Sequence, residues 1–150
     1  MRLSYSREDL IIGFFILLAI LYPFIIAMLI FLEDVKERKH NIEEVRSFYR
    51  FLLGLEECRE DRAEELSEFM SETFAQSIGG KEGLLRTCQS YRKAYSTARA
   101  EERKVEEEQV LVDLIKKEKG MTQRLLSLTV KFKSENGNLK IEGVEYEKGD

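Results

Sequence analysis

Residues 10–32 read LIIGFFILLAILYPFIIAMLIFL and contain no charged residue, no amide and no histidine. As an α-helix this run would extend about 34 Å, enough to cross a hydrocarbon core of roughly 30 Å with some tilt. A helix also satisfies its own backbone hydrogen bonds in lipid. The run therefore predicts a transmembrane helix over residues 10–32 that contacts membrane lipid.

Two other interpretations apply to an apolar run near an amino terminus. A buried core helix would rarely stay apolar for this length. A signal peptide has an apolar region of about 7 to 15 residues that precedes small residues at the cleavage site, whereas this run ends in Phe31-Leu32-Glu33-Asp34. We therefore expect an anchor that stays attached, with Pro23 bending it near its middle.

The predicted anchor divides the chain into a tail (residues 1–9), the span (10–32), a charged stalk (33–41) and one domain of ordinary size (42–150). The only histidine, His40, lies in the stalk and is expected to be solvated. The chain has 24 Lys and Arg against 28 Asp and Glu, a net charge of -4. The charges of the tail cancel, so the domain is acidic, which argues against nucleic acid as a partner.

Three stretches of the domain carry apolar residues at helical spacing. Asn41 and Glu44 form a capping-box pattern at the start of the first stretch. Gly79 and Gly80 mark the end of the second. The predicted helices span residues 41–55, 61–76 and 81–95.

From Glu108 the period of the apolar residues changes to two, which predicts strands. The first strand ends at a turn formed by Lys119 and Gly120, and the next spans residues 123–134. Residues 96–104 could end the third helix, form a loop or add a short strand. The sequence therefore predicts three to four antiparallel strands.

The Asn136-Gly137 pair predicts a hairpin, because both central residues of a type I′ turn need positive φ. Pairing about this turn places Phe132 opposite Ile141. The apolar residues of the last strand then change phase, from Leu139 and Ile141 to even-numbered positions.

A β-bulge would absorb this change of phase. If Glu142 and Gly143 together face Lys131, then Val144 meets Val130, Tyr146 meets Leu128, and the apolar face stays continuous. We expect this bulge. If it requires a positive φ at Gly143, a valine there would strain it.

The two cysteines, Cys58 and Cys88, form no CxxC motif and have no histidine beside them, so no metal and no cofactor is expected. If the domain lies outside the cytoplasm they could form one disulfide. As an alternative, they are two separate small hydrophobic residues in helix packing.

The charges around the span leave the orientation open. Arg2 and Arg7 precede the span, and five basic residues follow it closely, which would place the domain in the cytoplasm. The rule is weak for long carboxy-terminal domains, however, because these cross largely regardless of charge.

The order of three helices and then bent strands, closing in SLTVKFKSENGNLKIEGVEY (residues 127–146), resembles the nuclear transport factor 2-like superfamily of cystatin-like α+β cones. In that family a final strand of the type Lys-Ile-x-x-Val closes the sheet, here Lys140, Ile141 and Val144. Leu139 stands where a tryptophan is usual. The resemblance covers roughly residues 43–147. It implies an α+β fold in which three helices pack on a bent antiparallel sheet.

The family includes enzymes and many binding or assembly modules, and its enzymes use acidic, tyrosine or histidine side chains inside the cone. The resemblance implies pocket candidates at Tyr91, Tyr95, Asp113 and Tyr146. A carboxylate on an apolar strand face can have a raised pKa and act as a base. Asp113 is therefore the one catalytic candidate.

One span joined to a cone is similar in layout to the single-span assembly factors of type IV secretion systems. We expect a non-enzymatic interaction or assembly module of the cell envelope, anchored in the membrane, with its domain outside the cytoplasm. A protein partner is expected, and a homodimer through the sheet is plausible. The alternative is a ligand-binding or enzymatic cone. A pocket over about 300 Å³ in which Asp113 and a tyrosine converge would favour that alternative, and a filled cone the first interpretation.

Overall fold

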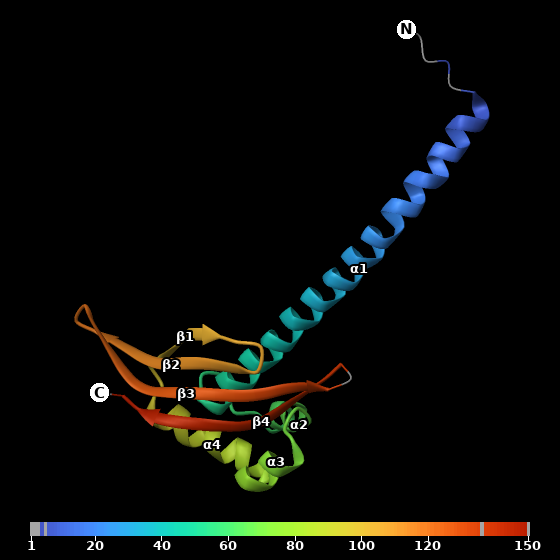
Figure 1. Ribbon diagram of the computed structural model, residues 1–150. Coiled ribbons are helices and arrows are strands. Elements are labelled where there is room, and N and C mark those ends of the chain that lie inside the picture. Colours follow the sequence, from blue (N-terminus) through green and yellow to red (C-terminus); the bar gives the residue numbers. More distant parts are fainter. Residues whose placement is uncertain (1–3, 5, 136, 150) are drawn as a thin grey trace. The chain divides into compact units, whose positions relative to one another are not determined.

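The computed structural model describes residues 4, 6–135 and 137–149. These residues form an α+β fold of four helices followed by four strands (Figure 1). The helices are α1 (Arg7–Leu52), α2 (Glu60–Ser67), α3 (Glu72–Ile78) and α4 (Gly80–Ala94), and the strands are β1 (Arg99–Val105), β2 (Gln109–Glu118), β3 (Met121–Glu135) and β4 (Asn138–Lys148).

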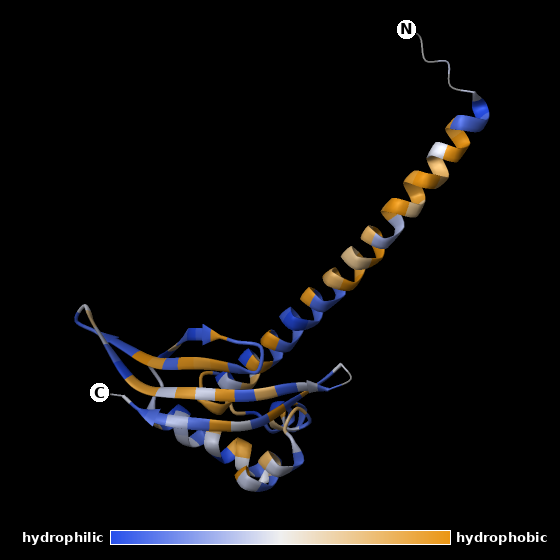
Figure 2. Ribbon diagram, viewed as in Figure 1, coloured by the Kyte–Doolittle hydropathy of each residue, from blue (hydrophilic) through white to orange (hydrophobic). Residues whose placement is uncertain are grey.

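The chain divides into two compact units, residues 1–39 and residues 40–150, and α1 contributes to both. In the first unit, α1 carries the apolar run, and no residue of its most hydrophobic stretch is buried within the chain. Figure 2 shows this part of α1 as almost uniformly hydrophobic. By length and composition, the helix can cross a membrane. Pro23 lies inside α1, which continues past it.

The expected helix start at Asn41 is wrong, because α1 continues through the stalk to Leu52. The stalk consists mainly of good helix formers, without glycine or proline, and its Asp34 and Arg38 form an i, i+4 ion pair at 3.3 Å. A capping pattern therefore does not start a new helix here. The side chain of His40 is 70% exposed, which confirms that it is solvated.

The helix expected over residues 61–76 is also wrong, since it is divided into α2 and α3. Between them Met70 forms a parallel bridge with Ile141 of β4. The Ile141 amide donates to the Phe69 carbonyl at 2.6 Å, and the Ser71 amide donates to the Ile141 carbonyl at 2.9 Å. Ser71 then caps α3 by accepting from the Phe74 amide. This tertiary pairing overrides a continuous helical pattern.

The four strands form an antiparallel sheet in the order β1-β2-β3-β4. Residues 96–104, which the sequence left open, supply most of β1. The short helices lie on one side of the sheet (Figure 1). The core lies between these layers, and its fully buried side chains include Phe48, Phe51, Leu84, Leu128 and Ile141.

The predicted register of the last hairpin is confirmed. Phe132 pairs with Ile141, Lys131 with Gly143, Val130 with Val144 and Leu128 with Tyr146, and the register shifts between Lys131 and Phe132. Of the turn itself, Gly137 has a φ of +77°, and Asn136 lies outside the described residues.

The bulge does not require glycine, however. Gly143 is not among the residues with positive φ, and a Cβ built on it would meet no atom within 4 Å. The condition for strain, a positive φ at Gly143, is therefore not met, and the expectation that a valine there strains the bulge is wrong.

Candidate functional site

Three of the four pocket candidates come together as a stack of rings. Tyr91 and Tyr95 are four residues apart at the end of α4, so their rings lie on the same helix face, with centroids 5.8 Å apart. Tyr146 of β4 pairs with the buried Leu128, which places its ring on the helix side of the sheet. The rings of Tyr91 and Tyr146 stack at 6.0 Å with an interplanar angle of 12°.

This tyrosine stack (Tyr91, Tyr95 and Tyr146) lies at the surface. Tyr146 is 46% exposed, and Tyr91 and Tyr95 are half-buried. Burial raises the pKa of the Tyr91 hydroxyl, against the effect of its hydrogen bond with Tyr146. Tyr91 is therefore neutral at physiological pH, and the stack offers flat apolar faces with hydroxyl groups at their tips.

Asp113 lies apart from the stack, on the opposite face of the sheet. Its neighbours in β2, Val112 and Leu114, point into the core, so its own side chain points outward. Arg103 donates to both carboxylate oxygens at 3.0 and 2.6 Å. The Ser127 hydroxyl donates to Oδ1 at 2.6 Å.

These contacts contradict the role of Asp113 as a base inside the cone. Burial alone would raise the pKa of the carboxyl, but the hydrogen bonds from Ser127 and Arg103 outweigh burial and lower it. The carboxylate is ionised and paired at neutral pH. On the outer sheet face it joins Arg103 of β1 to Ser127 of β3.

A bulge in β1 brings Arg103 to Asp113. The β1–β2 register shifts between Glu102 and Lys104, so the side chains of Arg103 and Lys104 lie on the same face. This network was not predicted, because the sequence left open whether residues 96–104 form a strand. The available signal was one extra charged residue, Arg103, which interrupts the alternation of side chains in that stretch.

A second polar network joins β1 to α1 within residues 40–150. The Arg46 guanidinium donates to both carboxylate oxygens of Glu102, from Nε to Oε1 and from Nη2 to Oε2 at 3.0 Å. The Tyr49 hydroxyl donates to Oε1 of Glu102 at 2.8 Å. The bond from Arg46 is the main cause that lowers the pKa of Glu102. This network fixes the edge strand β1 to the helix.

Cys58 and Cys88 form a disulfide. Cys88 is fully buried on α4, and Cys58 lies in the loop between α1 and α2. Of the two alternatives, a disulfide and two separate thiols, the structure has the disulfide.

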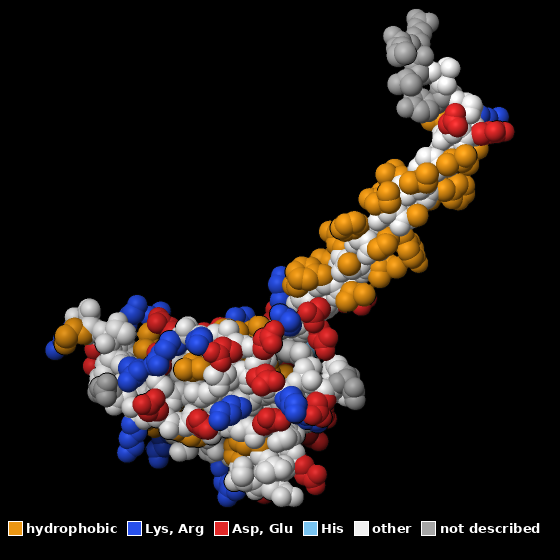
Figure 3. Space-filling view, in the orientation of Figure 1, with side chains coloured by type: hydrophobic (Ala, Val, Ile, Leu, Met, Phe, Trp, Pro, Cys, Tyr) orange, Lys and Arg blue, Asp and Glu red, His pale blue; other side chains and the backbone are white. Residues whose placement is uncertain are grey.

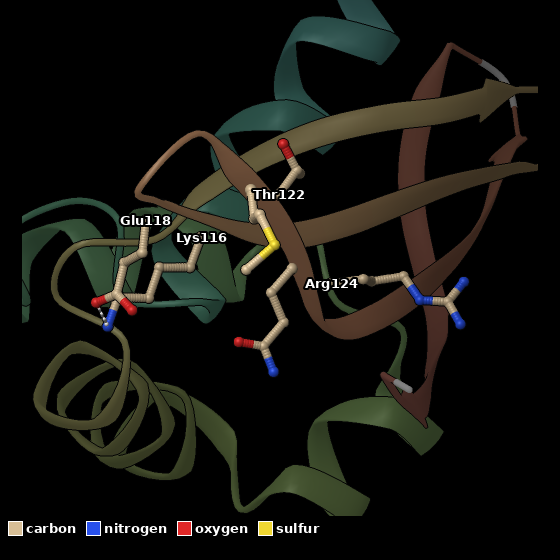
Figure 4. A pocket seen from close by; sticks show the side chains of 6 residues that line it. Lys116, Glu118, Thr122 and Arg124 are labelled. Carbon is tan, nitrogen blue, oxygen red and sulfur yellow. Dashed lines mark ion pairs between the residues drawn. The ribbon is translucent and has the colours of Figure 1, made fainter.

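The described residues line at least two surface hollows. The first, of about 330 Å³, is lined only by the β2–β3 hairpin: Lys116, Glu118, Met121, Thr122, Gln123 and Arg124. In Figure 4 the Lys116 and Glu118 side chains pair on one side, and the guanidinium of Arg124 points away on the other. Their charged ends do not converge on a common point.

The second hollow, of about 300 Å³, lies beside the β4 bulge and is lined by Glu108, Gln109, Lys131, Phe132, Lys133 and Glu142. Neither hollow is lined by Asp113 or by a residue of the tyrosine stack. Within the described ranges, no three His, Cys, Asp or Glu side chains are grouped as metal ligands.

One face of the domain carries mixed charges. Figure 3 shows Lys and Arg side chains interspersed with Asp and Glu on the face in view. On that face, side chains of the two signs alternate over the domain.

No family model, no curated protein and no solved structure matches this chain.

Proposed function

We propose that this chain is a non-enzymatic interaction or assembly module of the cell envelope, held in the membrane by residues 10–32. The tyrosine stack carries the proposal. Tyrosine is enriched in protein interfaces because a rigid ring buries a large area at low entropic cost while its hydroxyl finds a partner. Here three such rings lie together, and the most exposed belongs to an edge strand.

The interior of the domain supports an interaction module over an enzyme. The interior of the domain is a cluster of buried apolar side chains, and its one catalytic candidate is an ion-paired carboxylate on the outer face. The sheet order and the bulged final hairpin agree with an α+β cone of the nuclear transport factor 2-like type, which we propose as its fold family.

The Cys58–Cys88 disulfide supports a domain outside the cytoplasm, since disulfides persist in oxidising compartments. A homodimer through the sheet stays a prediction.

Site-specific photocrosslinking in membranes tests the proposal. A photoreactive phenylalanine analogue replaces Tyr95 or Tyr146 in the full chain, and a control replaces Lys119, which is exposed in the β2–β3 turn. We expect both tyrosine positions to give the same protein adduct of discrete mass and the Lys119 position to give none. No adduct from either tyrosine position would contradict an interaction role for the stack.

A further inference from the structure

The carboxyl-terminal half of β4 presents a free sheet edge. β4 is the last strand of the sheet, as Figure 1 shows. In its amino-terminal half, Ile141 is paired on the outer side with Phe69 and Ser71. Beyond the bulge at Glu142 and Gly143, no such segment pairs with β4 among the described residues.

The alternation of the antiparallel ladder identifies the backbone groups that point to this free edge. The Gly149 amide donates to the Leu125 carbonyl of β3, so the odd-numbered residues of this half face β3. The amide and carbonyl groups of Val144, Tyr146 and Lys148 therefore point outward. Unpaired edge groups of this kind are templates for an added strand.

The two faces beside this edge differ in chemistry. On the helix side lie Val144 and the exposed ring of Tyr146 with the rest of the tyrosine stack. On the outer side lie Glu145 and Glu147, both exposed. Lys131 pairs with Glu145 at 2.6 Å, and no described residue forms an ion pair with Glu147.

We infer that the partner binds as an extended segment that adds a strand to β4 along Val144, Tyr146 and Lys148, with basic side chains alternating with apolar or aromatic ones. This inference rests on the proposed function and names the partner's chemistry. Basic side chains of such a strand would lie beside Glu145 and Glu147, and apolar ones beside Val144 and Tyr146. The protein already uses the same edge in this way, where residues 69–71 pair with Ile141.

Pairing with a second copy of this chain about Tyr146 is disfavoured at this edge. If two β4 strands paired antiparallel about Tyr146, Glu145 of each copy would face Glu147 of the other. Like charges directly opposite one another destabilise a strand pair. Acidic side chains at the edge thus disfavour self-pairing and favour a basic partner.

The test uses the full chain in detergent micelles and a fluorescent heptapeptide in which Lys alternates with Val or Tyr. Two further peptides carry N-methyl groups, one on the Lys residues and one on the Val and Tyr residues. Only one of these sets points its amides at β4, so we expect one N-methylated peptide to lose at least about tenfold in affinity and the other to bind nearly as the parent. Equal binding of all three peptides, or no binding of the parent, would overturn strand addition.

Charge variants test whether the basic side chains of the added strand lie on the outer face, beside Glu145 and Glu147. The double variant Glu145→Gln, Glu147→Gln should weaken binding of the Lys peptide, and a peptide with Glu in place of Lys should bind neither protein. The control Glu64→Gln, Glu65→Gln removes the same charge from two exposed positions of α2 and should leave binding unchanged. Equal weakening by both double variants would mean nonspecific attraction and would overturn the inference.

The outcomes separate this inference from the proposed function. A crosslinked partner at the tyrosine stack together with failed peptide binding would overturn strand addition alone. Adducts between two copies of this chain would also overturn it, while leaving an interaction role in place. Absence of any adduct at the stack would contradict the proposed function itself.

Discussion

Glu102 accepts three hydrogen bonds, two from Arg46 and one from Tyr49, and its side chain is only 19% exposed. The hydrogen bond from Arg46 lowers its pKa, and that from Tyr49 acts in the same direction. Because the folded-state pKa lies below the ordinary value of 4.5, this carboxylate stabilises the fold above about pH 4.5, and the contribution is lost as the pH falls through the lowered pKa.

Glu102→Gln should therefore lower stability at pH 7 by on the order of 1 kcal/mol, with a difference that shrinks towards pH 3. Thermal unfolding of the full chain in detergent, followed by circular dichroism at both pH values, measures this. Glu118→Gln is the control, since its side chain is 69% exposed and should give no change. A loss for Glu102→Gln that is as large at pH 3 as at pH 7 would show that the charge is not the cause.

Two glycines differ sharply in what a side chain would meet. Gly54, just after α1, has a φ of +69°, and a Cβ there would lie 2.2 Å from the backbone nitrogen of Arg92 in α4. Gly143 at the β4 bulge has neither constraint.

We expect Gly54→Ala to destabilise the protein by about 2–4 kcal/mol, through strain and displacement of α4, and Gly143→Ala to change stability by less than about 0.5 kcal/mol. Urea unfolding of the two variants in the same detergent compares them directly. Similar midpoints for both would mean that the loop after α1 can move away from α4.

At the scale of elements, the disulfide joins the loop after α1 to α4 across a separation of 30 residues. Closing a loop of this length in the unfolded chain stabilises a fold by about 3.6 kcal/mol. Reductant should therefore lower the unfolding midpoint of the parent, but not that of the Cys58→Ala, Cys88→Ala variant. If reductant leaves the parent unchanged, either the bond is absent or it contributes no stability.

The elements that the sequence predicted correctly are those set by local pattern. The apolar phase of residues 126–146 was sufficient to place the last hairpin and its bulge, because a one-residue slip would expose Val144 and Tyr146 on the wrong face. The division between α2 and α3 was not predictable, since it depends on backbone pairing of residues 69–71 with Ile141, far away in sequence.

The candidate site divides in the same way. Tyr91 and Tyr95 share a helix face by their spacing alone, whereas their contact with Tyr146 depends on how α4 packs on the sheet. Asp113 was misplaced because Leu111 and Ile115, beside it on the outer face, made that face look apolar. The neutralising Arg103 belongs to a strand that alternation alone did not reveal.

At the scale of the whole molecule, two features favour opposite orientations of the chain. The basic residues that follow the apolar run favour a cytoplasmic domain, and the disulfide favours an oxidising compartment. The charge rule loses weight when more than about 60 residues follow the span, as they do here. A disulfide such as Cys58–Cys88, by contrast, depends directly on the redox state of the compartment.

We therefore expect the domain to lie outside the cytoplasm, and Glu135→Cys in the β3–β4 hairpin tests this. The two native cysteines are bonded to each other and do not compete for label. An impermeant maleimide should label the variant on intact cells as strongly as after lysis, and should leave the parent unlabelled in both. Arg7→Cys, at the other end of the apolar run, is the matched control and should react only after lysis. The reverse pattern, with Arg7→Cys labelled on intact cells and Glu135→Cys only after lysis, would place the domain in the cytoplasm.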